Sequence, residues 1–294
     1  MNALSLPLLQ QFQSFCATNK PADLEEAIDC FAVFGGHNVK IDTNKPLFEL
    51  IENHVLSEYR YIHRNITDLT DGDAIYHALL TGIATGDRRM NSAFKRARVS
   101  EQEGKACIEE LYEKGLIHIE KSRAMPSERG DDYHLVCDKL LFATPFLRFW
   151  FAFVSPLFRG IQKKDFSEIE TAFASRKQEF TTHVFERLAM EYLKKIYVDD
   201  PIIECDSYWD GEIELSILAE TRSGKSIVAE CKYTNNKLKK SELSRIEEKC
   251  TIAGITPDIV VLFAKKGFSS ELKALKNESL QLVSARNFKK LIEA

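Results

Sequence analysis

The chain has 294 residues, of which 44% are hydrophobic and 10% aromatic, which is enough apolar material for the cores of two domains. Its formal net charge of −4 excludes a uniformly basic surface for nucleic acid, so any contact with a polyanion depends on local patches. The seven cysteines have no C-x-x-C spacing, which argues against a disulfide framework or a structural zinc site and favours a reducing, cytoplasmic compartment.

Residues 1–66 are predicted to be helical, because their apolar side chains recur at helical spacing on both sides of a Gly35-Gly36 break. This region carries no recognisable chemistry. Neither a signal peptide nor an apolar run of membrane-spanning length is expected.

Residues 67–140 have the pattern of a winged helix-turn-helix. Two helices are predicted over 71–84 and 91–98, and a third begins at Ser100, with Glu103 completing a capping box, and ends at Gly115. β-prone runs at 116–121 and 132–136 flank a polar loop that would form the wing.

The charges of this module leave its role open. The third helix, which would enter a major groove, is acidic, and a phosphate-lined groove disfavours it. The basic residues lie on the preceding turn and helix: Arg88, Arg89, Lys95, Arg96 and Arg98. DNA contact, protein docking and a purely structural role remain alternatives.

Residues 141–175 are expected to form a helical aromatic connector. The segment 140–158 is strongly apolar, but Pro145, Arg148 and Pro156 interrupt it. We therefore predict a buried aromatic-rich helical piece and no membrane element.

Residues 176–294 are predicted to form a mixed α/β domain. A long helix over about 165–197 comes first, and the apolar period then changes from helical spacing to two. The expected order after that helix is strand (208–220), strand (225–233), basic helix from about 237, strand (258–264), helix (269–276) and strand (280–285).

The stretch AETRSGKS at 219–226 satisfies a loose phosphate-loop pattern, but its context does not. A phosphate loop follows a strand and opens a helix, whereas Ser226 is followed by the alternating, β-branched run IVAECKY. We therefore predict a hairpin turn in which Gly224 has a positive φ, and we expect no nucleotide binding.

The ends of the same stretch, EIE and ECK, place charges at alternate positions. Residues two apart on a strand share a face, so Glu212 would join Glu214, and Glu230 would join Lys232. Glu214 comes beside Glu230 and Lys232 if the numbers of paired residues sum to about 444 to 446, which needs a loop of odd length or a bulge. Clustered carboxylates of this kind suit Mg²⁺ or Mn²⁺. The alternative is that both motifs are only polar strand faces.

Basic residues surround this stretch. Between positions 221 and 250 eight lysines and arginines stand against four acids. The candidate nucleic-acid-binding residues here are Arg222, Lys225, Lys237, Lys239, Lys240 and Arg245, and Lys249 is counted only as part of the basic segment 237–249.

Several stretches, in order, resemble the C-terminal region of the archaeal-type ATPase family, whose last domain belongs to the PD-(D/E)XK nuclease-like superfamily. They are AVFGGHNV (32–39), the winged-helix stretch, DKLLFATPFLRFWFAFVSP (138–156), YWDGEIELSILAE (208–220), ECKY (230–233) and LFAKKGFSSELKAL (262–275). The resemblance implies a C-terminal restriction-endonuclease-like mixed sheet flanked by helices, after a helical region with a winged helix.

Two departures from the family stand out: the ATPase module is absent from this sequence, and Glu214 stands where relatives carry Asp. By the superfamily's pattern, Glu214, Glu230 and the carbonyl of Cys231 would bind the metal, with Glu212 as an auxiliary ligand. Lys232 would be the catalytic cation, and Glu186 the helix-borne acid.

The resulting expectation is a Mg²⁺- or Mn²⁺-dependent DNA nuclease that holds a duplex or single strand mainly through its phosphates. The alternative is a catalytically silent DNA- or protein-binding module on a nuclease-like scaffold. The choice of DNA or RNA, and a homodimer, are left open.

Overall fold

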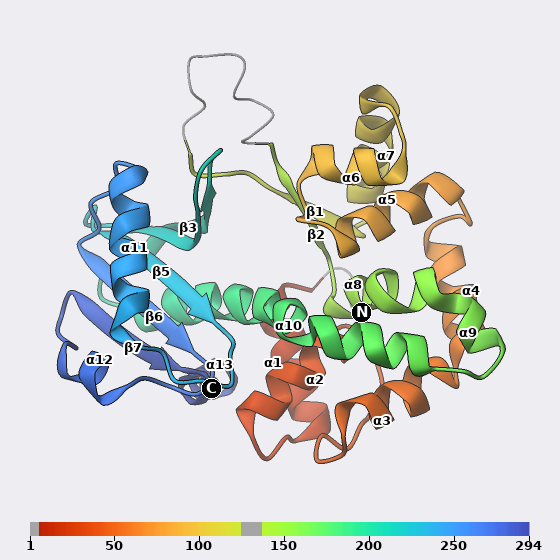
Figure 1. Ribbon diagram of the computed structural model, residues 1–294, viewed down its shortest axis with the longest axis horizontal. Coiled ribbons are helices and arrows are strands. Elements are labelled where there is room, and N and C mark those ends of the chain that lie inside the picture. The colour runs from red at the N-terminus through yellow and green to blue at the C-terminus, as the bar shows by residue number, and fades with distance from the viewer. Residues whose placement is uncertain (1–5, 125–136, 294) are drawn as a thin grey trace. The chain divides into compact units, whose positions relative to one another are not determined.

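The computed structural model describes residues 6–124 and 137–293 (Figure 1). The described residues divide into two compact units, one of 6–120 with 137–177 and the other of 121–124 with 178–293. Helix α10 (Ser167–Ile196) contributes residues to both units. Each unit is described by itself.

The first unit is almost entirely helical. Its elements are α1 (Leu8–Asn19), α2 (Leu24–Phe34), α3 (Leu47–Ile51), the π-helical η2 (Glu52–Leu56), α4 (Tyr59–Leu69), α5 (Ala74–Thr85), α6 (Met90–Ala97), α7 (Glu101–Glu113), β1 (Ile117–Glu120), β2 (Lys139–Phe142), α8 (Pro145–Phe149), the π-helical η4 (Trp150–Val154), the 3₁₀ turn η5 (Ser155–Leu157), α9 (Phe158–Gln162) and the start of α10.

The three predicted helices of the winged helix are confirmed as α5, α6 and α7. The Ser100 hydroxyl accepts a hydrogen bond from the Glu103 amide at 3.3 Å, and Gly115 follows α7 with a φ of +69°. β1 pairs with β2 in antiparallel fashion, which corrects the prediction that residues 140–142 open the aromatic helix. The strand predicted at 132–136 lies outside the described residues.

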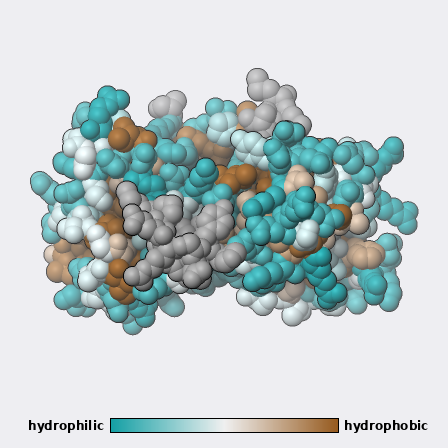
Figure 2. Space-filling model, turned by 90° about the horizontal axis from the view of Figure 1, so that it is seen from above, coloured by the Kyte–Doolittle hydropathy of each residue, from teal (hydrophilic) through white to brown (hydrophobic). Residues whose placement is uncertain are grey.

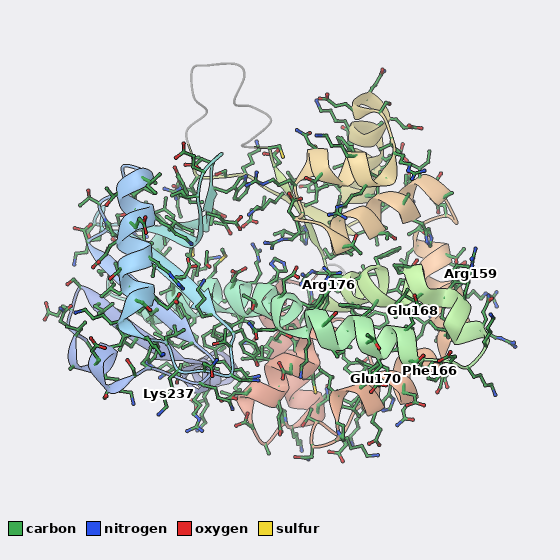
Figure 3. The ribbon with its side chains drawn as sticks, in the orientation of Figure 1. Arg159, Phe166, Glu168, Glu170, Arg176 and Lys237 are labelled. Atoms are coloured by element: carbon green, nitrogen blue, oxygen red, sulfur yellow. The ribbon has the colours of Figure 1, made fainter. Side chains whose placement is uncertain are left out.

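The aromatic segment is buried, as predicted. Phe149, Trp150 and Phe153 are each at most 1% exposed, and the rings of Phe149 and Phe153 meet Phe173 of α10 edge to face. Arg176, labelled in Figure 3, lies over the Phe153 ring at 5.6 Å. Among the described residues, no helix has the length and apolar character needed to cross a membrane.

The second unit is a five-stranded mixed sheet with helices, which agrees with the predicted fold class. Its strands lie in the order β3-β4-β5-β6-β7, antiparallel from β3 to β5 and parallel from β5 to β7. The elements that follow α10 are β3 (Ile202–Trp209), β4 (Glu214–Thr221), β5 (Ser226–Lys232), α11 (Lys240–Ile252), β6 (Ile259–Ala264), α12 (Ser270–Ala274), β7 (Leu280–Ser284), η6 (Ala285–Phe288) and α13 (Lys289–Ile292).

The single strand predicted over 208–220 is wrong, because a turn divides it into the end of β3 and most of β4. One carboxylate oxygen of Asp210 accepts hydrogen bonds from the amides of Glu212 at 2.7 Å and Ile213 at 2.8 Å. Asp commonly stabilises turns in this way. Glu212 therefore lies in a turn and does not share a strand face with Glu214.

Opposite faces of the sheet are covered by different helices. Leu262 of β6 belongs to the apolar cluster of Ile246 on α11, whereas the ring of the next residue, Phe263, meets Phe185 and Tyr192 of α10. In Figure 1, α11 lies in front of this sheet and the C-terminal part of α10 passes behind it. The α11 side and the α10 side are used below to name these two faces.

The surface drawn in Figure 2 is mainly hydrophilic, with apolar residues in small areas. The most exposed large apolar side chains in the described part are those of Val198, Tyr61 and Ile203. Scattered apolar residues of this kind are normal on protein surfaces and carry no inference by themselves.

Candidate active site

The β4–β5 hairpin has the predicted register. Ile217 pairs with Ala229 and Glu220 with Ser226, so the paired numbers sum to 446, and five residues lie between the last two partners. Gly224 in that connection has a φ of +83°, as predicted for the turn. Because β5 begins at Ser226, the sequence SGKS lacks the helix that a phosphate loop requires.

Glu230 and Lys232 lie together on the α11 side of β5. Val228 packs in the α11-side core, and strand alternation gives Glu230 and Lys232 the same direction. The Glu230 residue is 5% exposed, and the Lys232 Nζ lies 3.0 Å from Glu230 Oε1. The predicted E-x-K pair is therefore an ion pair whose acid is buried.

A second lysine reaches the same carboxylate from α11. The Nζ of Lys249 lies 3.2 Å from Glu230 Oε1 and donates a hydrogen bond to the backbone carbonyl of Glu214 at 2.8 Å. No role at this site was predicted for Lys249. The sequence feature that could have indicated Lys249 is its position between Ile246 and Cys250. The helical spacing of these two residues marks the buried side of α11.

Lys232 is a cation at neutral pH. Burial is the largest influence on the pKa of Lys232 and lowers it, but the charge and hydrogen bond of Glu230, with the charges of Glu242 and Glu186, outweigh burial. The pKa of Lys232 is therefore raised. A raised pKa suits a group that stabilises negative charge and does not suit a general base.

One oxygen of Glu230 is suited to a hard cation. Both lysines contact Oε1, whereas Oε2 is buried and has no hydrogen-bond partner among the described residues. A buried carboxylate oxygen without a partner is costly, and carboxylate oxygens are ligands that Mg²⁺ and Mn²⁺ prefer. Glu230 therefore fits the predicted role of a metal ligand through this oxygen.

A bulge in β4 separates the side chains of Glu214 and Glu230. Asp206 of β3 pairs with Leu218, but Tyr208 pairs with Leu215, so β4 contains one extra residue between these pairs. Leu215 and Leu218 consequently both face the α11 side. Alternation then directs Glu214 to the other face, and Glu214 reaches Lys249 through its backbone carbonyl.

Glu186 belongs to a different polar group on the α10 side. Its Oε1 accepts a hydrogen bond from the Ser216 hydroxyl at 3.1 Å, and the Ser216 oxygen also accepts from the Cys231 amide at 3.4 Å. The His183 Nδ1 lies 3.9 Å from Glu186 Oε2. Among residues 6–124 and 137–293, no group of three His, Cys, Asp or Glu side chains could hold a metal ion.

Cys231 lies on the same α10 side and is 2% exposed. Burial, followed by the charges of Glu186 and Glu230, raises the pKa of this thiol well above its ordinary value. The sulfur is therefore protonated at neutral pH, and only the predicted backbone carbonyl of Cys231 would offer an oxygen ligand.

The predicted basic residues of this unit lie in two places. Lys232, Lys237, Lys239 and Arg245 line a cavity of about 310 Å³, and Glu242 is the one acidic residue among the described residues that line it. Lys237 lies in the loop between β5 and α11 (Figure 3), and Lys240 is exposed at the start of α11. Arg222 and Lys225 lie in the hairpin turn, roughly 20 Å along β5 from Lys232.

In the first unit, the predicted basic residues of the winged helix divide into an exposed group and a half-buried group. Lys95, Arg96 and Arg98 are exposed on and after α6. Arg88 and Arg89 are half-buried, and the Arg88 carbonyl accepts a hydrogen bond from the Leu140 amide of β2 at 2.8 Å. This pair therefore contributes to the small sheet as well as to the local positive charge.

Residues 150–246 match a family model described as archaeal and bacterial proteins of unknown function. This family is known to occur in archaeal-type ATPase proteins, so the match agrees with the resemblance over residues 150–246. The match includes Glu186, Glu214, Glu230 and Lys232 and ends before Lys249. No curated protein and no solved structure shows significant similarity to the chain.

Proposed function

We propose that the second unit is a divalent-metal-dependent nuclease that hydrolyses phosphodiester bonds of DNA. The observation that carries the proposal is the buried Glu230, which has one oxygen without a hydrogen-bond partner in the described part of the chain and lies 3.0 Å from the ammonium of Lys232, a residue that also lines a basic cavity. Such an arrangement combines an oxygen ligand for a hard cation with positive charge for a phosphate.

Some residues of the chain would bind DNA phosphates, and others would stabilise charge on the reacting phosphate or hold the metal ion. Lys237, Lys239 and Arg245 would contact backbone phosphates at the cavity, and the Lys232 ammonium would stabilise negative charge that develops on the reacting phosphate. Glu230 Oε2 would hold Mg²⁺ or Mn²⁺. When bound, that ion polarises the phosphodiester and lowers the pKa of a coordinated water.

The test compares DNA cleavage by the full chain and by three variants with Mg²⁺ or Mn²⁺, on supercoiled and single-stranded DNA. Glu230→Gln and Lys232→Ala should each lose cleavage by about 100-fold or more, because each removes a group that acts on the reacting phosphate. Lys276→Ala, which changes an exposed lysine of the same unit, should cleave like the wild type. Equal rates for the wild type and Glu230→Gln reject the proposal.

The second candidate is a catalytically silent nucleic-acid-binding module. It is favoured by the charge balance at Glu230, whose one carboxylate already meets two lysines, and by the distribution of the predicted acids over two sheet faces. A silent module binds labelled DNA, is not stabilised by Mn²⁺ and cleaves no substrate. Stabilisation by a bound ion follows from linkage, so a rise in melting temperature with Mn²⁺ that Glu230→Gln abolishes favours the nuclease.

A further inference from the structure

Lys249 binds the kind of ligands that a divalent ion would take at this site. Its ammonium contacts a carboxylate oxygen of Glu230 at 3.2 Å and the carbonyl oxygen of Glu214 at 2.8 Å. Hard divalent cations prefer such oxygen ligands. One of these two Lys249 contacts is with a backbone atom, so it does not depend on the side chain at position 214.

Charge at the cluster of Glu230, Lys232 and Lys249 favours an anion. Two ammonium groups lie on one carboxylate oxygen, so these three residues carry a net charge of +1. The nearby Glu242 is itself paired with Arg245 at 2.5 Å, and the Glu186 carboxylate is bound by Ser216 on the α10 side. A divalent cation that joined this cluster would be repelled by both ammonium groups.

The Lys249 ammonium is placed where it could exchange Glu230 for another anionic partner. Its side chain is 31% exposed, and Arg245, one helical turn earlier on α11, lines the basic cavity beside Lys232. A phosphate at this end of α11 would offer the Lys249 ammonium an anionic partner in place of Glu230. Lysine suits such an exchange, because its stem is flexible and its head is a point charge.

We propose that Lys249 is an internal cation that opposes binding of the divalent metal at Glu230. In the free protein its ammonium lies on Oε1, repels a cation at Oε2 and so keeps metal affinity low, and nucleic-acid phosphates draw Lys249 away and so raise metal affinity. The inference rests on the proposed function, because it assigns the regulation of the same metal site. It concerns binding, so it can be tested without cleavage.

The experiment measures Mn²⁺ binding to the full chain without DNA, from the loss of the free-ion electron paramagnetic resonance signal. Lys249→Met removes the charge and keeps a long side chain, and it should bind Mn²⁺ about 10-fold tighter than the wild type. Lys276→Met, a charge-matched control at an exposed position, should bind like the wild type. Adding Glu230→Gln to Lys249→Met should abolish the gain, because the ion then lacks its carboxylate.

Equal or weaker Mn²⁺ binding by Lys249→Met overturns the inference, and so does a gain that survives in the double variant. Lys249→Gln and a melting curve for each variant show whether a failure reflects unfolding. A second Mn²⁺ titration is made in the presence of a short single-stranded DNA. The DNA should tighten Mn²⁺ binding to the wild type more than to Lys249→Met. If Lys249→Met gains affinity but no protein cleaves DNA, the inference stands and the proposed nuclease falls. If the wild type cleaves DNA and Lys249→Met gains no Mn²⁺ affinity, the proposed nuclease stands and the inference about Lys249 falls.

Discussion

The Ser216 hydroxyl donates a hydrogen bond to Glu186 across the α10 side of the sheet, at 3.1 Å. The same oxygen accepts from the Cys231 amide at 3.4 Å, so one side chain joins α10, β4 and β5. Ser216 lies in the bulged part of β4, where the extra residue changes which side chains face the helix. The bulge therefore gives Glu186 its partner and also turns Glu214 away from Glu230.

Replacement of Ser216 by Ala should destabilise the protein by about 1 to 2 kcal/mol, because it removes a donor to a mostly buried carboxylate and an acceptor for a strand amide. Urea unfolding measures the difference. Ser244→Ala, at an exposed position on α11, is the matched control and should change stability little. If both variants unfold at the same urea concentration, the Ser216 bonds contribute nothing.

The basic cavity, more than the hairpin turn, should account for DNA binding by the second unit. Lys237→Ala and Arg245→Ala should each weaken binding and reduce the slope of log K against log salt by about 1, because each removes one phosphate contact. Fluorescence anisotropy at several salt concentrations measures this slope. Arg222→Ala tests the turn, and a larger effect there than at Lys237 would place the DNA at the other end of the hairpin.

Gly224 should be needed for the turn and not for any nucleotide. Its φ is +83°, and an added Cβ would meet no atom within 4 Å, so the cost of Gly224→Ala is backbone strain of about 1 kcal/mol. Gly224→Asn should cost less, because Asn tolerates this conformation. Thermal unfolding compares the two variants. A rise in the wild-type melting temperature when ATP is added to protein already in Mg²⁺ contradicts the assignment of SGKS as a turn.

Acid should destabilise the first unit through His37. Its ring stacks on Phe146 at 4.2 Å, and burial, with the charge of His54, lowers the pKa of His37 to about 4. The unfolded chain takes up a proton near pH 6.5, whereas the folded chain resists protonation until about pH 4. Stability should therefore be full above pH 6.5 and fall between pH 6.5 and 4, by about 1 to 3 kcal/mol.

Denaturation at pH 7 and pH 5 measures this loss, and His37→Gln should reduce it. The substitution should not abolish the loss of stability, because burial also lowers the pKa of His77. His77 therefore adds a smaller loss of stability of the same sign. If His37→Gln loses as much stability as the wild type between pH 7 and pH 5, the role of His37 is contradicted.

Local features of this chain could be predicted because their causes are local. The sequence by itself determined the helix that starts at Ser100, the turn at Gly224 and the shared face of Glu230 and Lys232, since capping, a positive φ and strand alternation depend on neighbours in the chain. The Asp210 turn also has a local cause, but the continuous apolar alternation concealed it.

Only the tertiary structure decided what surrounds the E-x-K pair. The β4 bulge is defined by pairing with β3, and Lys249 reaches Glu230 because α11 packs on that face of the sheet, 19 residues further along the chain. Both depend on contacts between elements, and no pattern within one element specifies them. For the same reason the predicted acids lie on two faces of the sheet, and the cation on Glu230 is a lysine of the chain itself.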